Sequence, residues 1–167
     1  MDLEPDTGYF VVLVARAFMR VAEARLRPLG LGPAHMPILV ALSARGPLSQ
    51  KDLARHARIE QPTAAALLQR MEAAGLITRS PDPRDRRATK VSQTQHAIAL
   101  LPVALDQRAQ TIGAATATLT AEEIHTLDAL LARVLINLEA LVDDSVSATG
   151  KTDRSCSESG RVTSSRH

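Results

Sequence analysis

Cysteine and aromatic residues are almost absent from this chain of 167 residues. It has one cysteine, no tryptophan, one tyrosine and two phenylalanines. The single cysteine, Cys156, cannot form an internal disulfide, which favours a reducing compartment. Proteins that bind single-stranded nucleic acid need aromatic side chains on which bases stack. All three aromatic residues here lie before residue 19, so the basic middle of the chain is poorly suited to that task.

Long apolar runs are missing as well. The longest run near the start, residues 9–15, ends at Arg16 and follows three acidic residues. A transmembrane helix needs about 20 apolar residues and a secretory signal needs a basic leader. We therefore expect a soluble, cytoplasmic protein with no membrane partner. Apolar residues make up 45% of the chain, enough for one domain with its own core, with or without an appendage.

Motifs of catalysis and metal binding are also absent. The five histidines (His35, His56, His96, His125 and His167) include no pair at metal-ligand spacing within one helix. No glycine-rich phosphate loop and no nucleophile in a recognisable setting occurs. We therefore expect no enzyme activity, no cofactor and no metal site. A zinc-sensing role for His35 is a less favoured alternative to a structural or exposed histidine.

The charge is distributed unevenly along the chain. Residues 49–92 hold nine basic and five acidic side chains, whereas residues 93–144 hold two basic and seven acidic ones. The formal net charge of +2 therefore conceals a basic middle and an acidic C-terminal half. A basic middle suggests a polyanionic partner; the alternative is an ordinary solvated basic face.

Two short helices separated by a tight turn are predicted within the basic middle. Ser49 is suited to cap a helix from Gln50 to about His56, and a second helix begins near Pro62 and stops at Gly75. This is the helix-turn-helix arrangement. The pattern predicts that Ala64, Leu67, Leu68 and Met71 pack inward. The outer face, which could read base edges in a major groove, holds Gln61, Thr63, Ala66, Gln69 and Arg70.

A β-hairpin is predicted directly after the second helix. Residues 76–79 and 88–92 alternate like strands, and the loop between them is "SPDPRDRR". Such a hairpin forms a wing whose arginines can reach a DNA minor groove, where negative potential is concentrated. Asp82 and Asp85 would repel phosphates, so we expect them to hold Arg84 or Arg87 in place. The alternative is a solvated surface hairpin.

The rest of the chain reads as helical. Helices are predicted over 8–28, from about 33 to 44 and from 93 to about 118. Pro102 predicts a kink in the third of these helices. "TAEE" at 120–123 is a capping box. It opens a helix whose apolar residues from Ile124 to Leu141 follow heptad spacing, and Leu130, Leu135 and Val142 form a second stripe. We favour a dimerisation helix over one buried in the chain's own core, followed by a disordered tail over 144–167.

The order of these elements resembles the MarR family of bacterial transcriptional regulators. "DPRDRRA" at 82–88 is similar to the wing motif of that family, and "GLITR" at 75–79 to the glycine and strand before it. "LSQKDLARHARIEQPTAAALLQRMEAAGLI" has the family's helix-turn-helix spacing, and "LRPLGLGPAHMPILVAL" resembles its first interhelical corner. The resemblance covers about residues 8–143. After the wing the family commonly has leucine, threonine and, three residues later, glycine. This chain keeps the threonine (Thr94) but has Gln93 and Ala97 at the other two positions, so the start of that helix is expected to be shifted.

The resemblance implies a mainly α fold with a small β-hairpin wing. A winged helix-turn-helix domain (31–92) would stand between an N-terminal dimerisation helix (8–30) and C-terminal dimerisation helices (93–143). It further implies a homodimer on pseudo-palindromic double-stranded DNA, commonly a repressor released by a small molecule or oxidant. The first predicted helix lacks the reactive cysteine of the peroxide-sensing branch, so that mechanism is not expected. The alternative is a winged-helix module for protein assembly, which usually lacks the wing arginines.

Individual residues acquire expected roles from this resemblance. Arg86 corresponds to the wing arginine in the minor groove, and Arg84, Arg87 and Lys90 lie beside it as further DNA-binding candidates. For dimerisation the candidates are Phe10, Leu127, Leu131, Val134 and Leu138. The family's effector pocket would involve Phe10, Leu13, Arg16, Ala17, Met36 and Leu39. An apolar wall with one arginine suits a small aromatic or carboxylated effector, although the same residues also describe a normal core beside a surface arginine.

Overall fold

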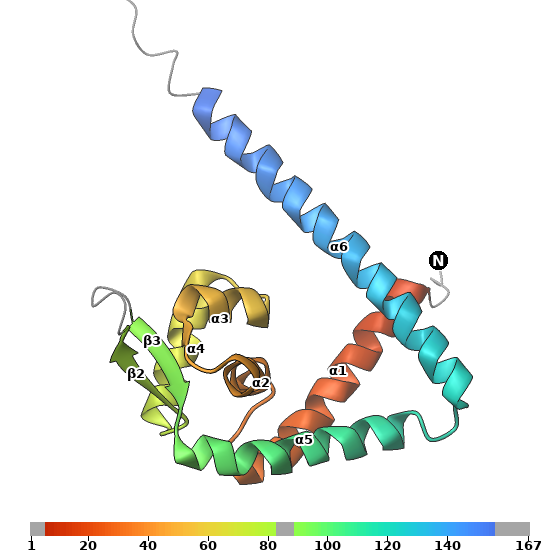
Figure 1. The fold of residues 1–167 in the computed structure, drawn as a ribbon. Helices are drawn as coiled ribbons and strands as arrows, with labels where there is room; N and C mark the ends of the chain where they lie inside the picture. The colour runs from red at the N-terminus through yellow and green to blue at the C-terminus, as the bar shows by residue number, and fades with distance from the viewer. Residues whose placement is uncertain (1–5, 83–88, 156–167) are drawn as a thin grey trace, which may run out of the picture. The chain divides into compact units, whose positions relative to one another are not determined.

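The computed structural model describes residues 6–82 and 89–155, with side chains described up to residue 142, and separates into two compact units (Figure 1). The first unit spans Met1–Ala115 and the second Thr116–His167. In chain order the first unit contains α1 (Thr7–Leu26), η1 (Arg27–Leu29), α2 (His35–Arg45), β1 (Leu48–Ser49), α3 (Gln50–Ala57), α4 (Gln61–Ala73), β2 (Ile77–Pro81), β3 (Thr89–Gln93) and α5 (Gln95–Ala115). The second contains α6 (Ala121–Ser155).

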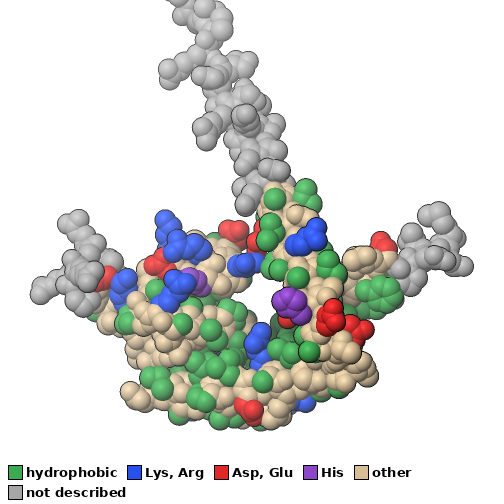
Figure 2. Space-filling view, turned by 45° about the vertical axis from the view of Figure 1, so that its right-hand side comes forward, with side chains coloured by type: hydrophobic (Ala, Val, Ile, Leu, Met, Phe, Trp, Pro, Cys, Tyr) green, Lys and Arg blue, Asp and Glu red, His purple; other side chains and the backbone are tan. Residues whose placement is uncertain are grey.

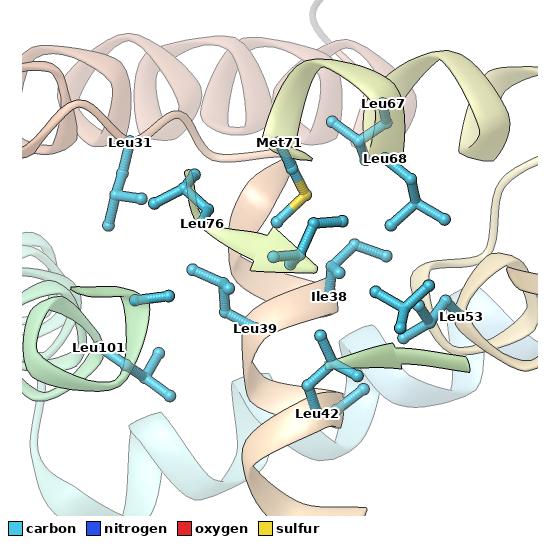
Figure 3. Packing of buried hydrophobic residues seen from close by; sticks show 14 of the residues in the cluster. Leu31, Ile38, Leu39, Leu42, Leu53, Leu67, Leu68, Met71, Leu76 and Leu101 are labelled. Atoms are coloured by element: carbon cyan, nitrogen blue, oxygen red, sulfur yellow. The ribbon is translucent and has the colours of Figure 1, made fainter. Parts of the chain in front are cut away.

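The core of the first unit lies where α2 meets α3, α4, α5 and the sheet. Ile38 and Leu39 of α2 are completely buried, as are Leu53 of α3 and Leu68 of α4. Ile38 lies on the side of α2 that faces Leu53 and Leu68, whereas Leu39 lies on the side of Leu76 and Leu101, and all belong to one core (Figure 3). The four inward positions predicted for the second helix of the helix-turn-helix, Ala64, Leu67, Leu68 and Met71, are all buried. That prediction is confirmed, and it fixes which face of α4 turns away from the core.

Local capping interactions determine where several helices begin. The Ser49 hydroxyl accepts a hydrogen bond from the Asp52 N–H at 3.1 Å, as predicted for the start of α3. The predicted capping box is also confirmed, because the Thr120 N–H donates to the Glu123 carboxylate at 2.8 Å. Thr94 accepts from the Ala97 N–H at 3.2 Å. The departure from the family pattern after the wing therefore leaves α5 with a normal cap.

The sheet has the strand order β1-β3-β2, and both pairings are antiparallel. The predicted hairpin is confirmed: Ile77 pairs with Gln93 at one end and Pro81 with Thr89 at the other. β1 was not predicted. It is two residues long, pairs with β3 in the register Ser49↔Lys90, and connects the start of α3 to the hairpin.

The last helix is longer than the sequence pattern indicated. α6 continues to Ser155, so the predicted boundary near residue 144, and with it the disordered tail over 144–155, is wrong. Residues 145–149 contain no proline or glycine, and adding a residue to an existing helix costs far less than starting one. The remainder of the predicted tail, with Cys156, lies outside the described residues.

Candidate nucleic-acid interface

The turn between α3 and α4 orients the two helices of the helix-turn-helix. Arg58 ends α3 in the left-handed conformation, with φ 53°, and its N–H donates to the last carbonyls of α3. The Ile59 N–H donates to the Ala54 carbonyl at 3.1 Å. Glu60 then precedes α4, and Pro62 occupies its first turn, where no backbone donor is needed. The reversal is therefore held by the backbone itself.

The outer face of α4 is accessible along the whole helix. All five side chains predicted to face DNA, namely Gln61, Thr63, Ala66, Gln69 and Arg70, are exposed. The opposite face is fully occupied by the core. Amides, a hydroxyl and a guanidinium offer both donors and acceptors, and the small Ala66 allows close approach. This combination suits the edges of base pairs in a major groove.

The wing residues divide into those the structure describes and those it does not. Arg84, Asp85, Arg86 and Arg87 lie outside the described residues, so their roles stay predictions. β2 and β3, which flank this loop, are fixed to the domain. Arg79 of β2 forms an ion pair with Glu72 of α4 at 3.1 Å, so the hairpin is tied to the helix that presents the outer face.

Lys90 and Asp82 form an ion pair that the sequence analysis did not anticipate. The Lys90 Nζ lies 3.5 Å from the Asp82 Oδ2. Lys90 had been predicted to contact DNA, and Asp82 to hold an arginine of the wing. Asp82, directly after β2, and Lys90, in β3, face each other at the two ends of the loop. The structure thus gives Lys90 a partner within the protein.

Basic residues of α3 were missed by the sequence analysis. Lys51 and Arg55 are exposed on this helix, and Arg55 forms an ion pair with Asp52 at 2.8 Å. Figure 2 shows lysine and arginine side chains close together on the left of the molecule. The first helix of a helix-turn-helix crosses the DNA backbone. The high density of basic residues in 51–58 was the available signal.

Asp52 is a charged residue whose pKa the fold lowers. The Ser49 hydroxyl donates to the Asp52 Oδ2 at 2.7 Å, and this hydrogen bond is the main cause. Partial burial opposes the shift, while Arg55 and Lys90 add to it. Because the pKa is lowered, the ionised carboxylate stabilises the fold at pH values above 3.8, the ordinary pKa of the group. This contribution is lost as the pH falls through the lower pKa of the folded state.

Replacing Ser49 with alanine should raise the pKa of Asp52 toward its ordinary value. The variant should also lose about 1 kcal/mol of unfolding free energy at pH 7, because the cap of α3 is removed. The difference from the wild type should narrow as the pH falls from 3.8 through the lower pKa of Asp52 in the folded wild type, because the carboxyl then becomes protonated in both proteins. NMR titration of the carboxyl, and denaturation at pH 7 and at a series of acidic pH values, measure these effects. Thr120→Ala removes a different cap and should leave the Asp52 pKa unchanged.

A cavity of about 430 Å³ lies between α1, α2 and α5 within the first unit. Its lining is mostly apolar but includes two arginines, Arg25 and Arg108. The Arg25 Nη1 donates to the Gln107 carbonyl at 3.5 Å. The lining residues are Phe18, Met19, Ala22, Arg25, Leu26, Pro33, Met36, Pro37, Val40, Ala104, Leu105, Gln107, Arg108 and Thr111.

Of the six residues predicted to form an effector pocket, only Met36 lines this cavity. Leu39 is completely buried in the core, whereas Phe10, Leu13, Arg16 and Ala17 are exposed on earlier turns of α1. Helical periodicity identifies a face of α1. The position along that face depends on where α2 and α5 cross it, which only the tertiary structure shows.

His35 lies beside this cavity, at the start of α2. Its Nδ1 accepts a hydrogen bond from the Gly32 N–H at 3.1 Å. Partial burial lowers the pKa of His35, Arg70 lowers it further, and Glu23 partly offsets the shift. The His35 ring therefore helps to hold the corner before α2 through this hydrogen bond. Among the described residues, no three His, Cys, Asp or Glu side chains are grouped so that they could hold a metal ion.

Comparisons with known proteins agree with this geometry. The family model described as the MarR family matches residues 29–88, from the end of η1 through the wing. A probable transcriptional regulator from Pseudomonas aeruginosa superimposes with a TM-score of 0.72 at 29% identity, over 80% of this chain and 99% of that one. The winged helix-turn-helix region of the chain thus resembles the MarR family, and the proteins that the chain matches are transcription regulators.

Two further transcription regulators match over most of the chain. A variant of MarR from Escherichia coli, solved in complex with operator DNA, has a TM-score of 0.71 and 25% identity, over 77% of this chain and 92% of that one. The HTH-type regulator YybA of Bacillus subtilis is 26% identical over 76% of this chain and 85% of its own length. Among the described residues, no helix is both long and apolar enough to cross a membrane.

Proposed function

We propose that this protein acts as a homodimeric repressor that binds a pseudo-palindromic operator and is released by a small effector. The observation that carries the DNA-binding part is the division of α4: one face is buried in the core, and the opposite face exposes the five predicted contact residues. In a dimer, two copies of α4 would enter successive major grooves about 34 Å apart. The wing arginines would add contacts in the minor groove.

Exposed apolar side chains support the proposed dimer. Along α6 the predicted seam is exposed, with Leu131 at 45% and Leu138 at 50% of their accessible area, and Figure 2 shows apolar side chains along this helix. The second stripe, Leu130, Leu135 and Val142, is exposed too. On α1, Phe10 and four apolar neighbours are also exposed. Apolar surface of this extent is unfavourable in water and marks an interface. Residues 8–30 and 93–143 are accordingly our candidates for the dimerisation segments.

The cavity in the first unit is our candidate for the effector site. Phe18, Met19 and Met36 provide an apolar wall, and Arg25 and Arg108 provide positive charge at its edge. A guanidinium recognises a carboxylate through two parallel hydrogen bonds. The lining thus suits a small aromatic carboxylate. Because α2 contributes both to this wall and to the core beneath α4, a ligand that moved α2 would alter the position of the outer face.

Selection of binding sites from a random duplex library tests the proposed function. A two-fold symmetric consensus with half-sites one helical turn apart is expected. Binding to it should weaken steeply with salt, because several phosphates are contacted. Weak binding that is blind to sequence would contradict operator recognition and would favour the alternative role in protein assembly. Transcription from a promoter that carries the selected site then distinguishes repression from activation.

Replacing Arg108 with glutamine should weaken the ability of the effector to release the protein from DNA. The affinity of the protein for DNA should stay the same. Benzoate serves as the probe, and benzamide as its neutral analogue, in a titration of the preformed protein–DNA complex. The wild type should respond to benzoate more strongly than to benzamide, and Arg108→Gln should lose most of this difference. Arg16→Gln, on an earlier turn of α1, is the control. Loss of release in the Arg16 variant alone would mean that the site lies nearer the N-terminus of α1.

A further inference from the structure

Lys90 occupies the central position of the sheet at the base of the wing. It pairs with Ser49 of β1 on one side and with Ser80 of β2 on the other. Its side chain is 29% exposed, and that of its ion-pair partner Asp82 only 16%. Asp82 immediately follows β2, and Lys90 is the second residue of β3. The pair thus joins the two ends of the loop that carries the wing arginines.

The same lysine also interacts with the start of the helix-turn-helix. Ser49, its neighbour in β1, caps α3 and donates to Asp52 at 2.7 Å. The charge of Lys90 contributes to the lowered pKa of Asp52. The ammonium group is therefore attracted by two carboxylates of its own domain, one at the wing base and one in the first turn of α3.

We propose that Lys90 and Asp82 form an anchor that sets the direction in which the wing leaves the sheet. Lys90 is then a positioning residue for DNA binding and makes no phosphate contact of its own, which replaces its predicted role. This inference rests on the proposed operator binding. To reach a phosphate, the lysine would have to leave Asp82, and this ion pair with a partly buried carboxylate would be lost. When Lys90 stays paired with Asp82, the ion pair instead keeps the two ends of the loop in register.

The variant Asp82→Asn gives the sharpest test, because the two explanations predict opposite signs. If Asp82 acts only through its negative charge, removing it reduces repulsion of the phosphates and tightens binding. If it anchors the wing, binding weakens by about two- to fivefold for each wing, the range expected from a surface ion pair. Glu60→Gln, an exposed acid before α4, is the matched control and should bind as tightly as the wild type or more tightly. Tighter or unchanged binding by Asp82→Asn overturns the proposal.

The variant Lys90→Met tests the absence of a phosphate contact. Its affinity should fall by a similar factor, but the slope of log K against log salt should equal that of the wild type. A lost contact would reduce this slope by about 0.9 for each lysine involved. The double variant should bind no more weakly than either single variant, because each already breaks the same pair. A smaller slope, or effects that multiply, would contradict the anchor.

Failure of the anchor and failure of the proposed function are separable in this series. If the wild type binds no duplex specifically, the operator-binding function fails before any variant is compared. If the wild type binds and Lys90→Met reduces the salt slope, the function stands and the anchor is wrong. Melting temperatures close to that of the wild type establish that the variants are folded.

Discussion

Replacing Leu131 with glutamate should abolish the dimer. Leu131 lies in the middle of the heptad seam of α6 and is 45% exposed in the single chain. In the proposed dimer it would be buried, at about 1.5–3 kcal/mol for a fully buried leucine. A glutamate there would be removed from water without a partner in both subunits, which costs several kcal/mol more. The expected product is a monomer or an unfolded chain at concentrations where the wild type is dimeric.

Light scattering after size exclusion, together with the melting temperature, measures this effect. Ala132→Glu is the control, because residue 132 shares a helix face with His125 and Glu139 rather than with the seam. It adds the same charge to the same helix and should leave the dimer intact. A stable dimer of native mass for Leu131→Glu would mean that α6 is not the interface. Dissociation of both variants would point instead to the net charge of α6.

The variant Arg86→Ala should weaken operator binding by about 1–3 kcal/mol for each half-site. If both wings of a dimer bind the operator, the affinity should fall by up to about the square of the factor for one wing. The minor groove concentrates negative potential, and truncation of Arg86 to alanine removes the guanidinium that would be attracted to it. The fold should be unaffected, because the described core consists of apolar side chains, and we expect the charged Arg86 to lie in a loop that faces solvent. Titration of the selected operator, with circular dichroism as the check on folding, measures this result.

Arg86→Lys separates charge from shape at the same position. Lysine keeps the positive charge but lacks the planar fork of the guanidinium, so its affinity should lie between those of the wild type and Arg86→Ala. Equal affinity of all three proteins would refute the role of Arg86. In that case Arg84 and Arg87 would become the first candidates for the minor-groove contact.

Most helix boundaries were predictable because their causes are local. Ser49 and Thr120 accept hydrogen bonds from N–H groups three residues ahead. Gly75, two residues after the end of α4, has a positive φ, so the helix cannot continue through it. Such signals lie within one turn of the chain. The buried face of α4 was likewise predictable, since helical periodicity places Leu68 and Met71 on the same side.

The strand β1 and the ion pair of Lys90 were not predictable in this way. A strand of two residues has no periodicity, and β1 exists only because Val91 and Lys90, about forty positions later, pair with it. The partner of Lys90 likewise depends on the register Ser80↔Lys90, which brings Asp82 within 3.5 Å. A cluster of arginines next to Asp82 made a different partner look more natural.

The sequence by itself indicated the resemblance to the MarR family, the order of the helices and the hairpin, and the residues on each face of α4. Capping, periodicity and charge act over a few residues, so their outcome can be read along the chain. Only the tertiary structure decided where the cavity lies on α1, that α3 begins beside the wing, and that Lys90 is held by Asp82. These features depend on contacts between residues far apart in the chain, and their geometry follows from how the helices and strands pack together.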